Sequence, residues 1–305
     1  MGQTETSVAT PPTSALRTWA DMIKFAHSIF ALPFALVATF WAGRARPGGW
    51  PSAGQVGLIV LCMVAARSFA MTFNRIVDAA IDARNPRTAS RPLPAGTIRR
   101  GQAWAFLVGS AALFLLGCGG FVWLDGNRWP IRLAIPTLVV LAGYSYCKRF
   151  TALAHFVLGA VIAFAPTAAW IAISPATLGL PAALLTGAVL FWIAGFDLIY
   201  ACQDVEVDRR EGLFSVPARL GVPAALWLSR GCHVATVGLL VGLGAAMHVG
   251  GLYWLACGLT ALLLAGEQSV VRPHDLSRVN LDFFTLNGCV SVVFAILAIA
   301  DGLLH

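Results

Sequence analysis

The apolar run QVGLIVLCMVAARSFAMTF (Gln55–Phe73) continues without a break into NRIVDAAIDARNPRTASRPLPAG (Asn74–Gly96). The first stretch has the length of a helix that crosses a bilayer, which takes about 20 apolar residues. The second carries two aspartates and four arginines at the point where that helix would leave the hydrocarbon. This junction predicts a helical membrane protein with charged chemistry at one membrane surface.

The composition of the whole chain extends this prediction. Of 305 residues, 58% are hydrophobic and 11% are charged, and the mean hydropathy is +0.76, whereas soluble domains carry about a quarter charged residues. Long unbroken apolar runs favour helices over a β-barrel. Nine candidate spans are Leu16–Ala42, Gln55–Phe73, Gln102–Trp123, Arg132–Cys147, Ala152–Ile173, Leu180–Tyr200, Ala224–His248, Leu252–Val271 and Leu281–Leu303. We therefore expect an all-α polytopic membrane protein, with a disordered tail (1–14) and one domain of nine transmembrane helices around a central cavity (15–305).

The distribution of lysine and arginine predicts the orientation of these spans. With nine spans, the N-terminus and the loop after every second span share one side of the membrane. The basic residues on that side are Arg17, Lys24, Arg75, Arg84, Arg87, Arg91, Arg99, Arg100, Lys148, Arg149, Arg209, Arg210, Arg219, Arg230, Arg272 and Arg278. The other side has only Arg44, Arg46, Arg128 and Arg132. We expect the first side to be cytoplasmic, in a protein integral to the inner (cell) membrane.

Other classes of function are disfavoured. The net charge of +7 reflects the orientation signal, and no module of stacked aromatic and basic residues indicates a nucleic-acid partner. The seven cysteines are scattered without a C-x-x-C pair. Neither a disulfide framework nor a zinc site is therefore expected.

Acidic residues recur at helical spacing. Asn74, Asp78 and Asp82 lie four residues apart, which keeps them on one face of a helix. A single D-x-x-x-D pair at a helix end is ordinarily a solvated cap or a salt-bridged face. A functional interpretation of the first pair is favoured because a second pair follows later in the sequence.

The second acidic segment has a similar layout. DLIYACQDVEVDRREG carries Asp197, Asp204 and Asp208 at intervals of seven and four, again along one helix face. Each motif is followed by a related loop, SRPLPAG (Ser90–Gly96) in one case and SVPARLG (Ser215–Gly221) in the other. The two regions end even-numbered spans that are four spans apart. This pattern predicts two pseudo-repeated halves that face one cavity.

Carboxylates that converge near lipid need cations to neutralise them. Hard divalent ions take oxygen ligands, and Mg²⁺ fits best when phosphate oxygens complete its coordination. Basic side chains that could oppose such a phosphate are Arg67, Arg75, Arg84, Arg87, Arg91, Lys148, Arg149 and Arg209. Acids, metal and bases together predict a diphosphate site at the membrane surface.

These motifs resemble those of the UbiA superfamily of intramembrane aromatic prenyltransferases. The family's N-x-x-x-D-x-x-x-D motif is matched by Asn74–Asp82, and its D-x-x-x-D motif by Asp204–Asp208. YSYCKRF (Tyr144–Phe150) is similar to the family's Y-x-x-x-K element. The resemblance begins at KFAHSIFALPFAL (Lys24–Leu36) and covers almost the whole chain.

Within the superfamily, the chain looks most like the 4-hydroxybenzoate polyprenyltransferase group. Its two motif segments resemble most closely the branch that acts in futalosine-dependent menaquinone synthesis. Members of the group commonly carry aspartate directly after the motif asparagine, where this chain has Arg75. The difference leaves the metal-ligand pattern intact and weakens the case for 4-hydroxybenzoate as the acceptor.

The resemblance also implies roles for individual residues. Two Mg²⁺ ions would be bound by Asn74, Asp78, Asp82, Asp204 and Asp208. The oxygens of a polyprenyl diphosphate would be contacted by Tyr144, Lys148 and one or more of Arg67, Arg87 and Arg91. An electron-rich ring would then attack the allylic cation left by the departing diphosphate. Lys148, Arg149 and Asp197 would be catalytic, with Asp197 at the hydroxyl of the aromatic acceptor and Arg149 at its carboxylate.

Several alternatives remain open. Within the superfamily, the acceptor could be a hydroxybenzoate, a dihydroxynaphthoate, a haem precursor or a chlorophyll precursor. A secondary transporter is the main alternative from another class, but transporter sites lie near the membrane midplane. A CDP-alcohol phosphotransferase is disfavoured because its D-G-x-x-A-R run is absent.

Overall fold

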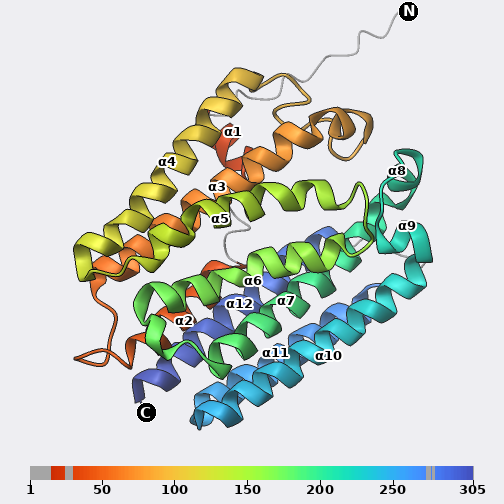
Figure 1. The fold of residues 1–305 in the computed structure, drawn as a ribbon. Helices are drawn as coiled ribbons and strands as arrows, with labels where there is room; N and C mark the ends of the chain where they lie inside the picture. The colour runs from red at the N-terminus through yellow and green to blue at the C-terminus, as the bar shows by residue number, and fades with distance from the viewer. Residues whose placement is uncertain (1–14, 25–29, 273–275, 277–278, 305) are drawn as a thin grey trace, which may run out of the picture.

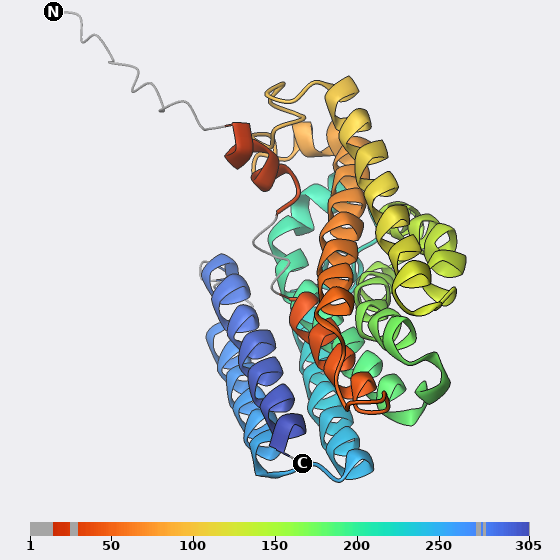
Figure 2. The ribbon, with the colours of Figure 1, turned by 90° about the vertical axis from the view of Figure 1, so that its left-hand side faces the viewer.

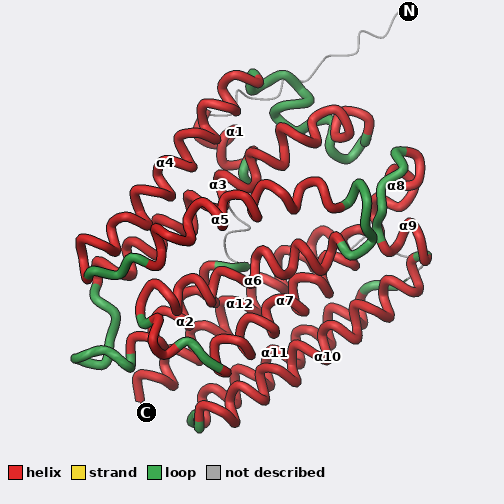
Figure 3. Tube along the Cα trace, viewed as in Figure 1, coloured by secondary structure: helices red, strands yellow, loops and turns green. Residues whose placement is uncertain are grey.

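The computed structural model describes residues 15–24, 30–272, 276 and 279–304, and the regular elements among them are helices (Figures 1 and 3). In chain order they are α1 (Ala15–Met22), α2 (Leu32–Gly43), α3 (Ala53–Arg84), α4 (Arg100–Asp125), α5 (Trp129–Cys147), α6 (Ala154–Ile173), α7 (Leu180–Ala201), α8 (Val205–Arg210), α9 (Val216–Leu220), α10 (Val222–Met247), α11 (Gly251–Val270) and α12 (Val279–Leu304), with 3-10 turns at Pro175–Thr177 and Cys202–Asp204. The predicted all-α class is confirmed. The predicted tail, 1–14, lies outside the described residues.

Seven helices are long and apolar enough to cross a bilayer, as expected of a polytopic membrane protein. They are α3 to α6, α10, the 31-residue run Leu180–Arg210 that joins α7 to α8, and the Thr285–Leu304 part of α12. Helix α2 is apolar but has only 12 residues. Length and composition therefore give seven spans in the described residues, and the predicted number of nine is not confirmed. The central cavity and the pseudo-repeated halves stay predictions.

The first predicted span, Leu16–Ala42, is interrupted in the structure. Helix α1 ends at Met22, and Lys24 has a positive φ of 49°. Helix α2 then begins at Leu32, with Pro33 in its first turn. Proline is tolerated there because the N–H groups of a first turn have no helical partner. The prediction of one continuous helix is therefore wrong, and residues 25–29 lie outside the described residues.

Helix α3 has 32 residues and carries the first acidic motif on its last turns. A capping box begins it, because Gln55 N donates to Ser52 Oγ at 3.2 Å and Ser52 N donates to Gln55 Oε1 at 2.8 Å. At 1.5 Å per residue, such a helix is about 48 Å long, against a hydrocarbon core of about 30 Å. The helix is too long to lie wholly in hydrocarbon, so its charged last turns can reach the aqueous boundary.

Helices α6 and α7 form an antiparallel pair, and α7 also packs against α10 and α12 (Figure 1). Gly159 of α6 permits the close approach, because a Cβ there would lie 2.5 Å from the carbonyl oxygen of Leu190 in α7. Small residues commonly serve this purpose between membrane helices. The contact fixes the height of α6 against α7, and with it the positions of the side chains one turn away on each helix.

The polar connections gather at one end of the bundle. Figures 1 and 2 place the loop after α3 and the α8–α9 segment at the end opposite the C-terminus and the α10–α11 turn. Hydrogen bonds join these connections, since Phe214 N donates to Lys148 O at 2.7 Å and Arg210 donates to Arg84 O at 2.8 Å. Both predicted acidic motifs lie at this end.

Candidate active site

The first acidic motif lies on the last turns of α3. Asn74 Nδ2 donates to Asp78 Oδ2 at 3.0 Å, which confirms that residues four apart share a face. Asp78 and Asp82 are 2% and 6% exposed. Carboxylates buried to this extent need positive charge or hydrogen-bond donors around them.

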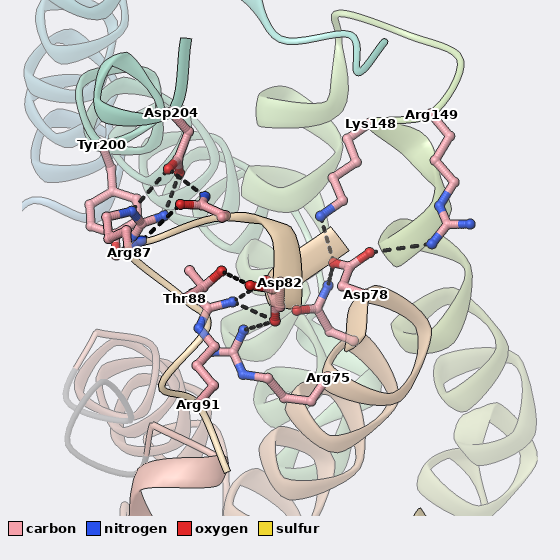
Figure 4. Close-up of polar contacts among 12 residues, drawn as sticks. Arg75, Asp78, Asp82, Arg87, Thr88, Arg91, Lys148, Arg149, Tyr200 and Asp204 are labelled. Carbon is pink, nitrogen blue, oxygen red and sulfur yellow. Dashed lines mark hydrogen bonds and ion pairs between the residues drawn. The ribbon is translucent and has the colours of Figure 1, made fainter. Parts of the chain in front are cut away.

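Asp78 receives that charge from the turn between α5 and α6 (Figure 4). Lys148 Nζ lies 2.5 Å from Asp78 Oδ2, and an Arg149 guanidinium nitrogen lies 3.4 Å from Asp78 Oδ1. Arg149 also donates to the carbonyl oxygen of Val77 at 3.0 Å. The structure thus places both predicted catalytic cations beside the first acidic motif.

Asp82 is held by two arginines. One nitrogen of Arg91, NH1, donates to both carboxylate oxygens at 2.7 and 2.8 Å. Arg75 NH1 lies 3.9 Å from Asp82 Oδ2, and Arg75 is itself 6% exposed. Thr88 holds the loop in place by donating to the carbonyl oxygen of Asp82 at 3.0 Å. The loop after α3 therefore folds back onto the motif that precedes it.

Asp204 of the second motif is bound by the same loop (Figure 4). Arg87 donates through Nε to Asp204 Oδ1 at 2.9 Å and through NH2 to Oδ2, while Asn85 Nδ2 donates to Oδ1 at 3.0 Å. The third nitrogen of Arg87 donates to the Tyr200 hydroxyl at 2.5 Å. Burial acts to lower the pKa of Arg87, but its bonds to Asp204 and Tyr200 raise that pKa overall.

The two motifs are thus linked through the loop that follows α3, with Arg91 on Asp82 and Arg87 on Asp204. A further pair reinforces the link at the surface. Arg84, the last residue of α3, donates from Nε at 2.9 Å and from NH2 at 2.5 Å to Glu211 Oε2. Segments more than 100 residues apart in sequence therefore form one ion-pair network.

Positive charge also reaches this region from the segment after α1. Burial lowers the pKa of Lys24, and the nearby guanidinium groups of Arg75, Arg91 and Arg87 lower it further. Three guanidinium groups therefore lie close to the Lys24 ammonium, while Asp21 acts on its pKa in the opposite direction.

The predicted site residues Arg67, Tyr144 and Asp208 form no ion pair within the described part of the chain. Arg67 donates to the carbonyl oxygen of Lys24 at 3.2 Å. Tyr144 lies within electrostatic range of Arg67, Arg75 and Asp78. Asp208, on α8, is half-buried, and its carbonyl oxygen accepts from Leu213 N at 2.8 Å. The roles assigned to Arg67, Tyr144 and Asp208 stay predictions.

Asp197 forms a separate pair with His155. Its Oδ2 lies 2.7 Å from His155 Nδ1, and the other ring nitrogen of His155 lies 3.3 Å from the backbone nitrogen of Val216. This pair follows directly from the α6–α7 contact at Gly159, because His155 is four residues before that glycine. The structure does not join Asp197 to Arg149, the other residue predicted to act on the acceptor.

The structure brings four further residues into this region: Arg75, which the sequence offers only as one of several cations for a phosphate, and Asn85, His155 and Tyr200, to which the motifs assign no role. Two of them had an available signal. Arg75 precedes Asp82 by seven residues and Tyr200 precedes Asp204 by four, so each lies near the helix face of a motif aspartate. The contacts of Asn85 and His155 depend on a loop conformation and on helix packing, which sequence periodicity does not encode.

The donor set of the two motifs fits a hard cation. Asn74, Asp78, Asp82, Asp204 and Asp208 all offer oxygen ligands. Three of these carboxylates already stabilise cationic groups at hydrogen-bond distance, with Lys148 at Asp78, Arg91 at Asp82 and Arg87 at Asp204. No three of the described histidine, cysteine, aspartate or glutamate side chains form a ready metal cluster. Their role as metal ligands therefore stays a prediction.

Comparison with known proteins agrees with this architecture. The chain is 31% identical over 247 residues to 4-hydroxybenzoate octaprenyltransferase from Burkholderia pseudomallei (strain 668), covering 81% of this chain and 84% of the relative. It is 32% identical over 237 residues to the enzyme of the same name from Azotobacter vinelandii, covering 78% of each.

Solved structures show the same fold. The apo structure of a UbiA homolog from Aeropyrum pernix K1 matches with a TM-score of 0.80 and 31% identity, covering 90% of this chain and 98% of that one. A UbiA homolog from Archaeoglobus fulgidus bound to GPP and Mg²⁺ matches with a TM-score of 0.69 and 20% identity, covering 93% and 99%. The UbiA prenyltransferase family profile matches residues 32–288. This chain therefore belongs to the UbiA prenyltransferase family.

Proposed function

We propose that the protein transfers a polyprenyl group from a polyprenyl diphosphate to an aromatic acceptor of the hydroxybenzoate or dihydroxynaphthoate type in quinone biosynthesis. The observation that carries the proposal is the ion-pair network at the end of α3. Carboxylates suited to a metal and cations suited to phosphate oxygens lie there within 4 Å of one another. The names of the relatives, 4-hydroxybenzoate octaprenyltransferases, support this reaction class.

Magnesium would be held by the oxygen-bearing side chains of the two motifs, with two ions expected. These are Asn74, Asp78, Asp82, Asp204 and Asp208. When bound, magnesium neutralises negative charge on the diphosphate and so favours its departure. The Archaeoglobus fulgidus homolog bound to GPP and Mg²⁺ supports the choice of magnesium.

The diphosphate oxygens would be held by the cations that now bind the motif carboxylates. Lys148, Arg87 and Arg91 each have their charged end within hydrogen-bond distance of a motif aspartate. If magnesium takes those carboxylates, the three cations are left beside a metal-bound anion, where phosphate is their natural partner. Tyr144 and Arg67 are further candidates for the same oxygens.

The acceptor would be bound beside Asp197, with Arg149 available for a carboxylate on its ring. In the reaction, the allylic C–O bond breaks and its electron pair leaves on the diphosphate. A pair of ring electrons forms the new C–C bond to the allylic carbon. The proton then lost by the acceptor passes to the Asp197 carboxylate.

The membrane setting suits such a donor. The isoprenoid chain is apolar and can lie along the spans, while its diphosphate meets magnesium at the membrane surface. The excess of lysine and arginine in the loops at this end favours the cytoplasmic face of the inner membrane. The predicted partners are the two substrates and the bilayer, and no nucleic acid.

A single incubation tests the proposal. Purified protein in lipid nanodiscs is given Mg²⁺, polyprenyl diphosphates of several lengths, and a panel containing 4-hydroxybenzoate and 1,4-dihydroxy-2-naphthoate. Mass spectrometry of the products identifies donor and acceptor together. We expect one prenylated aromatic acid, and its formation should stop when EDTA removes the magnesium.

Two motif variants complete the test. Asp78→Asn and Asp204→Asn should each lower the rate by about 100-fold or more, since a lost metal ligand weakens stabilisation by several kcal/mol. Gly143→Ala is the matched control, because its Cβ meets open space on α5. Full activity in both motif variants, or transfer that persists in EDTA, would contradict the proposal.

A further inference from the structure

The side chain of His155 is fixed by two hydrogen bonds on opposite sides of its ring. Nδ1 faces Asp197 Oδ2 at 2.7 Å, and Nε2 faces Val216 N at 3.3 Å. The side chain of His155 is 6% exposed, whereas that of Asp197 is 22% exposed. Asp197 is therefore the accessible member of the pair, and His155 lies behind it.

These two partners also determine where the proton of the ring is. The backbone N–H of Val216 only donates, so Nε2 must accept and carries no proton. The proton of the neutral imidazole then lies on Nδ1, where it is donated to Asp197. If Nε2 also carried a proton, its N–H group and the N–H group of Val216 would face each other with no acceptor between them.

The pair fixes the direction of the Asp197 carboxylate. Oδ2 is engaged by His155, while Oδ1 has no hydrogen-bond partner in the part of the chain that the structure describes. A carboxylate held at one oxygen cannot rotate freely about its Cβ–Cγ bond. Its second oxygen is therefore kept in one position.

The same histidine connects Asp197 to the segment that follows the second acidic motif. Val216 begins α9, and Phe214, two residues earlier, donates to the carbonyl oxygen of Lys148 at 2.7 Å. The segment 214–216 thus contacts both the turn that carries Lys148 and the ring that orients Asp197. A displacement of this segment would therefore also displace the turn that carries Lys148 and the ring of His155.

We propose that His155 is a positioning residue for Asp197 in prenyl transfer, a role that rests on the proposed function. Its Nδ1–H holds Oδ2, so that Oδ1 stays directed toward the proton of the bound acceptor. His155 keeps its own proton throughout, and Asp197 alone receives the one that the acceptor loses. The histidine acts through the aspartate and does not touch the substrate.

Two substitutions separate the hydrogen bonds of His155. Asn places its amide near the Nδ1 position and can still donate to Asp197, whereas Gln places its amide near Nε2 and can still accept from Val216. We expect His155→Gln to lower kcat by about 100-fold, the cost of a misplaced catalytic group, and His155→Asn to stay within about threefold. KM for the polyprenyl diphosphate should not change in either variant.

Two controls distinguish positioning from packing. His233 is a second buried histidine, 4% exposed, which contacts Gln268 of α11. His233→Asn and His233→Gln should change thermal stability without a difference in kcat between them. In an Asp197→Asn background, His155→Gln should lower kcat only slightly further, because the two residues act as one unit.

A spectroscopic measurement keeps the proposal testable even if the acceptor reaction proves to be a different one. In protein labelled with ¹⁵N-histidine, we expect one ring protonated at Nδ1 and bare at Nε2. That signal should vanish in His155→Asn and shift in Asp197→Asn. An Nε2-protonated His155, equal kcat losses in the Asn and Gln variants, or additive losses with Asp197→Asn would overturn the proposal. Absence of any prenyl transfer by the wild type would instead refute the proposed function and leave the ¹⁵N result to decide on His155.

Discussion

Arg87 and Arg91 come from the same loop but bind their aspartates in different ways. Arg87 uses Nε and NH2 on the two oxygens of Asp204 and a third nitrogen on Tyr200. Arg91 uses a single nitrogen on both oxygens of Asp82. The first geometry requires the planar guanidinium fork, whereas a point charge can reproduce the second.

This difference predicts unequal effects of lysine. Arg87→Lys should lower the unfolding free energy of the metal-free protein by about 1–2 kcal/mol, since it loses charged hydrogen bonds at a part-buried site. Arg91→Lys should cost less than Arg87→Lys, because a lysine ammonium can also bind both oxygens of Asp82. Thermal unfolding in detergent with EDTA measures both. Equal destabilisation by the two variants would show that the geometry of the fork does not matter here.

At the scale of residues, the sequence predicts contacts between side chains of the same helix. It does not predict contacts between side chains of different helices. The four-residue spacing is enough to place Asn74 against Asp78. Arg75 receives no role from the motif, although its seven-residue distance from Asp82 puts both on one face. His155 and Asp197 are 42 residues apart, and no spacing connects them until the packing of α6 on α7 is known.

At the scale of elements, the contact between α6 and α7 depends on a missing side chain. Gly159→Ala would place a methyl group 2.5 Å from the carbonyl oxygen of Leu190, a fixed backbone atom. The helices would have to separate, at a cost of about 1–3 kcal/mol. This separation would also pull His155 away from Asp197, which lies seven residues, about two turns, beyond Leu190 on α7.

We therefore expect Gly159→Ala to lower both the thermal midpoint and kcat. The matched control is again Gly143→Ala, at a helical glycine with open space around its Cβ, which should be neutral or slightly stabilising. Differential scanning fluorimetry and the prenyl-transfer assay measure the two effects. A Gly159→Ala protein with wild-type kcat would show that the register of α6 and α7 is not needed for the reaction.

The link between α3 and the end of α8 should depend on pH. The hydrogen bond from Arg84 lowers the pKa of Glu211 below its ordinary value of 4.5. A carboxylate with a lowered pKa stabilises the fold above its ordinary pKa, and that contribution is lost as the pH falls through the lowered value. Glu211→Gln removes the charge at every pH.

Wild type and Glu211→Gln should accordingly differ in thermal midpoint at pH 7 and converge as the pH falls below the lowered pKa of Glu211. The difference should be small, because Arg84 is 54% exposed and exposed ion pairs contribute little. Unfolding curves of the two proteins between pH 3 and pH 7 make the comparison. A difference that grows toward acid would contradict the expected direction and rule out a stabilising role for the Glu211 charge.

For the whole molecule, the sequence predicts the all-α class but not the path of the first span. Apolar length identifies α3 to α6 and α10 because hydrophobic runs of this length have few alternatives. The run Leu16–Ala42 is apolar on average and so predicts one helix. The positive φ at Lys24 and the new helix at Leu32 are local backbone events that average hydropathy does not detect.

The two ends of the molecule differ in the number and pairing of their arginines. This difference is relevant to the orientation of the protein in the membrane. At the end opposite the acidic motifs, Arg46, Arg128 and Arg132 line one cavity with Asp125. Arg46 is neutralised there, since NH1 lies 3.1 Å from Asp125 Oδ2. At the motif end there are more than three arginines, and they surround the proposed diphosphate site. By the positive-inside rule, this difference supports the proposal that the motif end faces the cytoplasm.

Thiol labelling of membrane vesicles tests this orientation. Pro47 and Ala95 are exposed residues in loops at opposite ends of the bundle. A membrane-impermeant maleimide should label Pro47→Cys in right-side-out vesicles and Ala95→Cys only in inverted ones, each measured above the background of the seven native cysteines. Labelling of Ala95→Cys from the outside would reverse the topology. Magnesium and diphosphate would then have to reach the site from the other side of the membrane, which a soluble cytoplasmic pool of either could not supply.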